Sequence, residues 1–148
     1  MRLVFYGGIM ISLLGNLVGF LFFIGIIYLI INSMKTHPEA FELEDGEEIL
    51  ELVKGDYWVK ELLWQEKQNS GEFAFTNKRV IFKGMFLNSA DKFISIPYSE
   101  ILSIEKTFVG LFFPVAFKIT TKDNQTYKFA VMKRDKYIDL MKQMAQNN

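Results

Sequence analysis

The chain has 148 residues and no cysteine, and its 17 Lys and Arg residues balance its 17 Asp and Glu residues. The absence of cysteine excludes disulfide bonds, thiolate metal sites and cysteine nucleophiles. A net charge of zero also argues against nucleic-acid binding, which depends on a surplus of Lys and Arg.

The N-terminal segment 3–32 contains no charged residue. It is longer than the roughly 20 apolar residues that carry a helix across about 30 Å of hydrocarbon. Tyr6 and Tyr28 would lie about 33 Å apart along such a helix. Amphipathic rings at that separation suit the two interfaces of one bilayer. The sequence therefore predicts a single-pass protein with a membrane anchor helix in residues 1–32.

Two alternatives for this segment remain open at the level of sequence. A cleaved signal peptide would use Arg2 as its basic region, but the apolar run is far longer than a signal core and no small-residue cleavage site follows it. A re-entrant hairpin would break near Gly15 and Asn16, and neither half would then be long enough to span the bilayer.

Small residues in the segment are regularly spaced. Gly8, Ser12, Gly15 and Gly19 follow one another at intervals of four, three and four positions, which places them on one face of a helix. Such a face lets another helix approach closely in lipid. The sequence suggests an association face for a second copy or another membrane protein, although glycine is also simply common in membrane helices.

Residues 33–45 suggest a short juxtamembrane linker, because Pro38 prevents the helix from continuing. The domain in residues 46–148 would then stay close to the lipid headgroups. Arg2 and Lys35 flank opposite ends of the anchor, so the positive-inside rule does not select an orientation.

The remaining chain shows the period-two alternation of half-buried strands up to residue 131. We expect separate strands at 48–53 and 57–64, and turns at 54–56 and 69–71. Apolar residues at i, i+3, i+4 and i+7 in 137–144 predict a helix. The expected domain is mainly β, with about seven short strands closed by a C-terminal helix.

Four stretches of this domain, GEFAFTNKRVIFKG, ISIPYSEILSIEK, FKITTKDNQTYKFAV and KRDKYIDLM, resemble a GRAM domain of the pleckstrin-homology-like (PH-like) superfold. The most telling element is TNKR at 76–79, followed by VIF at 80–82. The resemblance covers roughly residues 47–144. It implies a seven-stranded bent barrel or sandwich capped by a C-terminal α-helix. It also implies a non-catalytic module that binds membrane lipids or proteins and works in the cytoplasm.

One candidate site in this domain is cationic. Lysine and arginine near an anionic leaflet each contribute about 1 kcal/mol of attraction. However, the 76–79 element also suits a turn stabilised by its own side chains. Acids concentrate in 39–72 and bases in 73–148, which suggests a polarised domain but disfavours tight headgroup recognition around the first strand pair. The candidate lipid or anion ligands are Lys78, Arg79, Lys83, Lys92, Lys133, Arg134 and Lys136.

A second candidate site is the segment 108–115, which is apolar where two strands should turn. One interpretation is a hydrophobic tip that contacts the membrane. The other is that Phe108 and Phe112 extend two core-facing strands around Gly110. The candidate contact residues are Phe108, Leu111, Phe112 and Phe113.

Signatures of catalysis are absent from the sequence. His37 is the only histidine, and the chain has no P-loop, nucleophile elbow or metal-ligand constellation. We therefore expect no enzyme activity, metal or cofactor. The predicted function is weak recognition of lipid headgroups by a module anchored in the cell membrane, with its domain facing the cytoplasm. The alternative is an adaptor that assembles partner membrane proteins through the barrel and the small-residue helix face.

Overall fold

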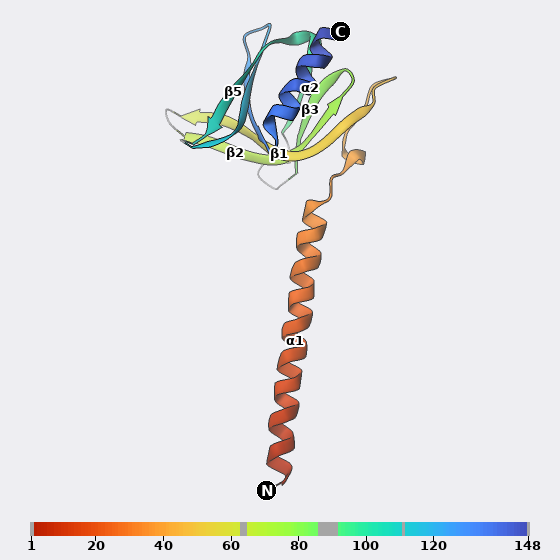
Figure 1. The fold of residues 1–148 in the computed structure, drawn as a ribbon, viewed down its shortest axis with the longest axis vertical. Coiled ribbons are helices and arrows are strands. Elements are labelled where there is room, and N and C mark those ends of the chain that lie inside the picture. Colours follow the sequence, from red (N-terminus) through yellow and green to blue (C-terminus); the bar gives the residue numbers. More distant parts are fainter. Residues whose placement is uncertain (1, 63–64, 86–91, 111, 148) are drawn as a thin grey trace. The chain divides into compact units, whose positions relative to one another are not determined.

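The computed structural model describes residues 2–62, 65–85, 92–110 and 112–147 (Figure 1). Side chains are described for the same residues, except in 2–14, 33–34, 61–62, 65 and 147. The chain divides into two compact units, Met1–Lys35 and Thr36–Asn148.

The first unit is one helix, α1, which covers Arg2–Met34 without a break at Gly15 or Asn16 (Figure 1). This continuity excludes a hairpin that reverses at these two residues. Within α1, the 18 residues Gly15–Asn32 are long and apolar enough to cross a membrane, and their side chains are not buried against other parts of the protein. The predicted anchor helix is therefore present and could span a bilayer.

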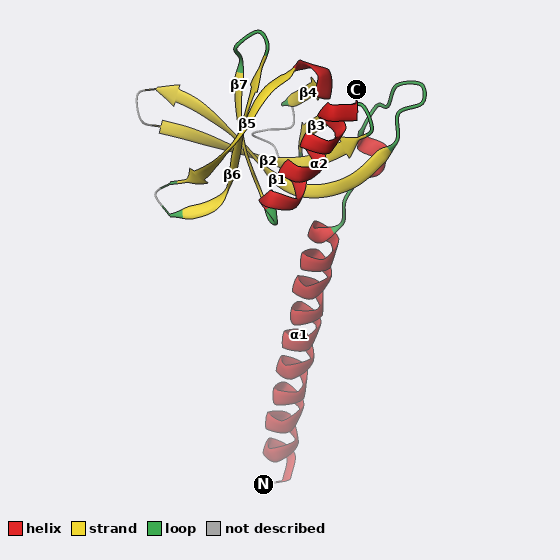
Figure 2. Ribbon diagram, turned by 45° about the horizontal axis from the view of Figure 1, so that its top comes forward, coloured by secondary structure: helices red, strands yellow, loops and turns green. Residues whose placement is uncertain are grey.

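The second unit is a seven-stranded antiparallel sheet that curls into a half-barrel, with one helix at its C-terminal end (Figure 2). The strand order is β4-β3-β2-β1-β7-β6-β5, so β4 and β5 form the two edges. This architecture confirms the predicted mainly β fold with a C-terminal helix. The elements are η1 Pro38–Ala40, β1 Ile49–Leu62, β2 Gln65–Thr76, β3 Arg79–Gly84, β4 Phe93–Pro97, η2 Tyr98–Glu100, β5 Ile101–Val109, β6 Phe113–Thr121, β7 Thr126–Val131 and α2 Arg134–Asn147.

The turns expected at 54–56 and 69–71 are wrong, because β1 and β2 continue through both segments. Gly55 pairs with Gly71, and Gly71 pairs with Gly84 on the next strand. A Cβ atom on Gly55 would lie 2.5 Å from the carbonyl oxygen of Ala130. Gly55 therefore permits β1 and β7 to approach closely in the middle of β1, and it does not mark a turn.

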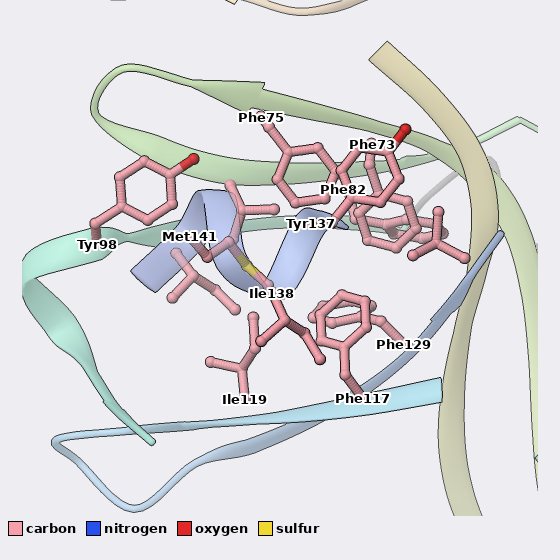
Figure 3. Packing of buried hydrophobic residues seen from close by; sticks show 13 residues of the cluster. Phe73, Phe75, Phe82, Tyr98, Phe117, Ile119, Phe129, Tyr137, Ile138 and Met141 are labelled. Atoms are coloured by element: carbon pink, nitrogen blue, oxygen red, sulfur yellow. The ribbon is translucent and has the colours of Figure 1, made fainter. Parts of the chain in front are cut away.

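The main core lies on the concave side of the sheet, and aromatic side chains dominate it (Figure 3). The rings of Phe73 and Phe129 pack edge to face, with their centroids 5.1 Å apart. From α2, Tyr137 stacks on Phe75 at 4.7 Å, and Met141 is fully buried. The apolar stripe predicted for the C-terminal helix is thus the face that α2 buries against the sheet.

A smaller cluster lies on the outer side of the sheet, where Phe41 packs against Ala74 and Ile81. Phe41 belongs to residues 37–48, which we call the N-terminal strap. This segment precedes β1 and contacts the outer side of β2 and β3. Residues 37–45, which the sequence suggests as a linker, therefore contact the sheet; the domain boundaries themselves remain a prediction.

Candidate membrane-contact site

The 76–79 element forms a tight turn that binds the strap. The Thr76 hydroxyl accepts hydrogen bonds from the backbone N–H groups of Lys78 and Arg79, at 3.1 and 2.9 Å. The Asn77 side chain accepts a bond from the Glu48 N–H and donates one to the Gly46 carbonyl oxygen. The side chains of this turn satisfy backbone groups, as the structural interpretation of the motif predicts.

Arg79 forms a buried ion pair with Glu47 of the strap. Its Nε and Nη2 atoms donate to the two carboxylate oxygens at 2.9 and 2.8 Å, and the Glu47 side chain is fully buried. Burial alone would raise the pKa of Glu47, but hydrogen bonds from Arg79, from the Glu44 backbone and from Thr76 lower that pKa to about 2. The guanidinium of Arg79 is therefore already neutralised within the fold.

Two further cations predicted for anion binding also contact the strap. The Lys78 ammonium donates to the Asp45 carbonyl oxygen at 2.7 Å, and the Lys83 ammonium donates to the Ala40 carbonyl oxygen at 2.6 Å. Lys92 directly precedes β4, and its carbonyl oxygen accepts a bond from the Gly84 N–H. Lys78, Arg79 and Lys83 thus each have the chain's own strap as a partner.

The acidic and basic parts of the chain are also joined by ion pairs. Acids from residues 39–72 meet cations from residues 73–148 at several points, so the separation of charge along the sequence does not produce separate charged faces there. These pairs are Arg79–Glu47, Lys78–Glu44, Lys128–Glu66 and Lys136–Glu51.

The remaining candidate cations lie where β7 leads into α2. Arg134 donates from Nη1 to the carbonyl oxygens of Thr107 in β5 and Ala116 in β6, at 3.0 and 3.2 Å. Lys136 is paired with a carboxylate 2.6 Å away. Lys133 is exposed and has a φ of 58°, the left-handed conformation. Among the candidate cations that the structure describes, the Lys133 side chain alone has no polar partner.

The β5–β6 hairpin carries exposed aromatic side chains at its tip. Phe108, Phe112 and Phe113 are 53%, 79% and 67% exposed, and Gly110 turns the chain with a φ of 57°. Leu111 lies outside the described residues. The exposed fractions exclude the interpretation in which Phe108 and Phe112 extend core-facing strands.

The hairpin and the start of α2 border an open hollow of about 290 Å³, lined by Pro114, Val115, Lys133, Arg134, Asp135 and Lys136. Asp135 accepts a salt bridge from Lys106 of β5 at 3.1 Å. This hydrogen bond and that from Arg134 lower the pKa of Asp135, so its carboxylate remains charged. Arg134 and Asp135 together connect both hairpin strands to α2.

Met132 is a feature of this region that the sequence analysis did not identify. Its side chain is 73% exposed and directly precedes the exposed Lys133. The available signal was an apolar residue that continues beyond the alternating strand and stands immediately before a pair of cations. Its exposure adds an apolar group to the same end of the sheet as the hairpin tip.

The predicted association face lies in the other unit. Gly15 and Gly19 are exposed on α1, and a Cβ atom on either would meet no other atom within 4 Å. The side chain of Ser12 and the surroundings of Gly8 lie outside the described side chains. Association through this face remains a prediction.

Comparisons with known proteins agree with this architecture. The family model for the GRAM domain matches residues 35–148. No curated protein matches the chain significantly.

Solved structures show the same fold. The C-terminal domain of an unknown protein from Leishmania infantum is 26% identical, with a TM-score of 0.54, over 68% of this chain and 86% of that one. The Vps36 N-terminal PH domain is 15% identical, with a TM-score of 0.51, over 72% and 84%. A chain in the structure of human RhoA with the DH/PH fragment of PDZRHOGEF is 11% identical, with a TM-score of 0.53, over 76% and 34%. The chain therefore belongs to the GRAM domain family and has a PH-like fold.

Proposed function

We propose that this protein is a membrane-anchored, non-catalytic module whose GRAM domain recognises the lipid surface weakly. The observation that carries the proposal is the exposed aromatic tip of the β5–β6 hairpin, on a domain that follows a membrane-length apolar helix in the same chain. Clustered exposed apolar side chains mark interaction sites. GRAM domains are membrane-associated and typically non-catalytic, and the expected setting is the cytoplasmic side of the cell membrane.

Recognition by the domain alone should be weak because most candidate cations already have partners. Lys78, Arg79 and Lys83 contact the strap, and Lys136 is paired with Glu51. A cation adds about 1 kcal/mol of attraction only when it is free to approach an anionic headgroup. An anchor in the same chain compensates for weak contacts by raising the effective concentration of lipid near the domain.

The direct test uses residues 36–148, because both hydrophobic clusters lie wholly within this unit. We expect the domain to co-sediment with anionic vesicles at millimolar lipid, more weakly with neutral vesicles, and less at high salt. An absence of binding to both vesicle types at low salt would contradict lipid recognition by the domain.

The second candidate function is an adaptor that assembles partner membrane proteins. It is favoured by the spacing of Gly15 and Gly19 on one face of α1, because glycines there would allow a partner helix to approach closely. Recovery of the same membrane proteins with the full chain, and their loss with Gly19→Ile, would support this function over lipid recognition.

A further inference from the structure

We infer that the domain contacts the bilayer by one defined end and inserts the tip of the β5–β6 hairpin into the interfacial region. This end, which we call the hairpin end, consists of residues 107–110, 112–115 and 132–136. The inference rests on the proposed function and deepens it, because it names the contacting surface and its ligand, the interface of an anionic bilayer.

The hairpin end behaves as one unit because α2 is bonded to both hairpin strands. The Arg134 guanidinium contacts the Thr107 and Ala116 carbonyl oxygens, and Asp135 is bridged to Lys106. These contacts tie the direction of the hairpin to the position of α2, whose apolar side chains pack in the core. A hairpin held in this way can present its tip without a large ordering cost on binding.

The exposed groups of the hairpin end match the chemistry of a bilayer interface. Phe112, Phe113 and Phe108 supply apolar rings, and Met132 supplies a flexible apolar chain. Lys133, which has no polar partner among the described residues, stands next to Met132. Apolar side chains beside a cation suit a surface where acyl chains meet anionic phosphates.

The chain enters the second unit at β2, three strands away from β6 of the hairpin. The first strap residue, His37, donates its backbone N–H to Glu72 at 2.8 Å, and Glu72 pairs with Lys54 across the sheet. In the next row Gly55 pairs with Val131, the last residue of β7. A hollow of about 340 Å³ is lined in common by Lys54, Gly55, Val115, Val131 and Met132.

Only Lys35 and Thr36 separate the end of α1 from His37, and two extended residues span at most about 7 Å. The second unit therefore begins within three residues of the end of α1 in the sequence. This proximity favours lipid over a soluble protein as the ligand of the aromatic tip.

The test places a single tryptophan at the tip of the full-length chain. In a variant carrying Trp58→Phe and Trp64→Phe, Phe112→Trp is compared with Leu102→Trp, in vesicles of phosphatidylcholine and phosphatidylserine with brominated acyl chains. Leu102 is a matched control because it is 61% exposed and lies on β5 at the end far from the tip. We expect strong quenching of the tryptophan at position 112 and little at position 102. Equal quenching at both positions, or none at 112, would overturn the inference.

A second measurement retains both native tryptophans. In residues 36–148, Phe112→Ser with Phe113→Ser should weaken vesicle binding about tenfold or more, and Leu102→Ser should leave it nearly unchanged. All three side chains are exposed, so the substitutions leave the core intact. If the domain binds vesicles and the double substitution has no effect, the hairpin inference fails while the proposed function stands. If neither the domain nor the full-length tip engages lipid, both fail.

Discussion

Glu47 and Arg79 show how single residues in this domain serve its structure before its function. The carboxylate is fully buried, and the guanidinium bonds both of its oxygens. Removal of one partner from a buried ion pair leaves an uncompensated charge, which is strongly destabilising. The pair therefore fastens the strap to the turn after β2, and Arg79 is a structural residue in this fold.

We predict that Glu47→Gln lowers the free energy of unfolding of residues 36–148 by about 3 kcal/mol at neutral pH. The folded pKa of about 2 lies below the ordinary value of 4.5, so the ionised carboxylate stabilises the fold above pH 4.5. This stabilisation is lost as the pH falls from 4.5 through 2. Urea unfolding at several pH values should show a shallower acid dependence for the variant. Identical pH profiles for the two proteins would contradict the role of the pair.

Lys133 has a strained, left-handed backbone conformation, and its ammonium group has no polar partner among the described residues. Its left-handed conformation is unfavourable for lysine and easier for asparagine. We predict that Lys133→Asn preserves or raises stability, by up to about 1 kcal/mol, and weakens binding to anionic vesicles about fivefold. Thermal unfolding and vesicle co-sedimentation measure the two effects.

The control for this prediction is Lys122→Asn, which removes the same charge from the exposed β6–β7 turn. It should reduce vesicle binding less than Lys133→Asn does. Equal losses would show that binding follows net charge alone and that the position of Lys133 is unimportant.

At the level of elements, the glycines inside β1 and β2 explain why the sequence predicts turns at 54–56 and 69–71, where the strands in fact continue. Gly55 and Gly71 face each other in the register, and both sit where neighbouring backbone or core rings approach closely. Local sequence cannot distinguish a glycine in a turn from a glycine inside a strand where other atoms leave no room for a Cβ. The atoms that exclude the Cβ come from distant segments of the chain. The Ala130 carbonyl oxygen above Gly55 is one such atom.

We predict that Gly71→Ala destabilises the domain by about 3 kcal/mol, because its Cβ would overlap the Lys83 carbonyl oxygen and press on the Phe82 ring. Gly110→Ala is the comparison. It has open space and only a φ of 57° to accommodate, and should cost about 1 kcal/mol. Urea unfolding of both variants would contradict the crowding argument if Gly71→Ala cost no more than Gly110→Ala.

At the scale of the whole molecule, the two units have separate tasks. In the proposed function, α1 holds the chain at a membrane, because Gly15–Asn32 is long and apolar enough to cross one. The GRAM domain supplies contacts through its surface, and the strap is the part of that domain nearest in sequence to the anchor. The second candidate function uses α1 itself to contact another membrane helix, independently of lipid recognition by the domain.

For the anchor we predict that Gly19→Ile weakens any association of the full-length chain in vesicles, because the side chain would fill the open face beside Gly15. Energy transfer between labelled chains is the measurement. Leu17→Phe, on the opposite face, is the control. Association that is unaffected by Gly19→Ile would leave the small-residue spacing without a role in packing.

Local patterns in the sequence were enough to predict the N-terminal apolar helix, the mainly β domain and its C-terminal helix. An uncharged run of membrane length, period-two alternation and an i, i+3, i+4, i+7 stripe are all carried by residues close together in the chain. The GRAM resemblance rested likewise on short contiguous stretches, and the family match over residues 35–148 confirms it.

Long-range contacts determined what the candidate residues do. Arg79 bonds Glu47, 32 positions away, and Lys83 bonds Ala40, 43 positions away. These cations, which the sequence suggests as an anion site, hold the strap against the sheet. From sequence alone, the aromatic residues Phe108, Phe112 and Phe113 suited either the core or the surface. In the folded domain their side chains are exposed. Burial and charge pairing are properties of the assembled fold, because they depend on which distant segments the curled sheet brings together.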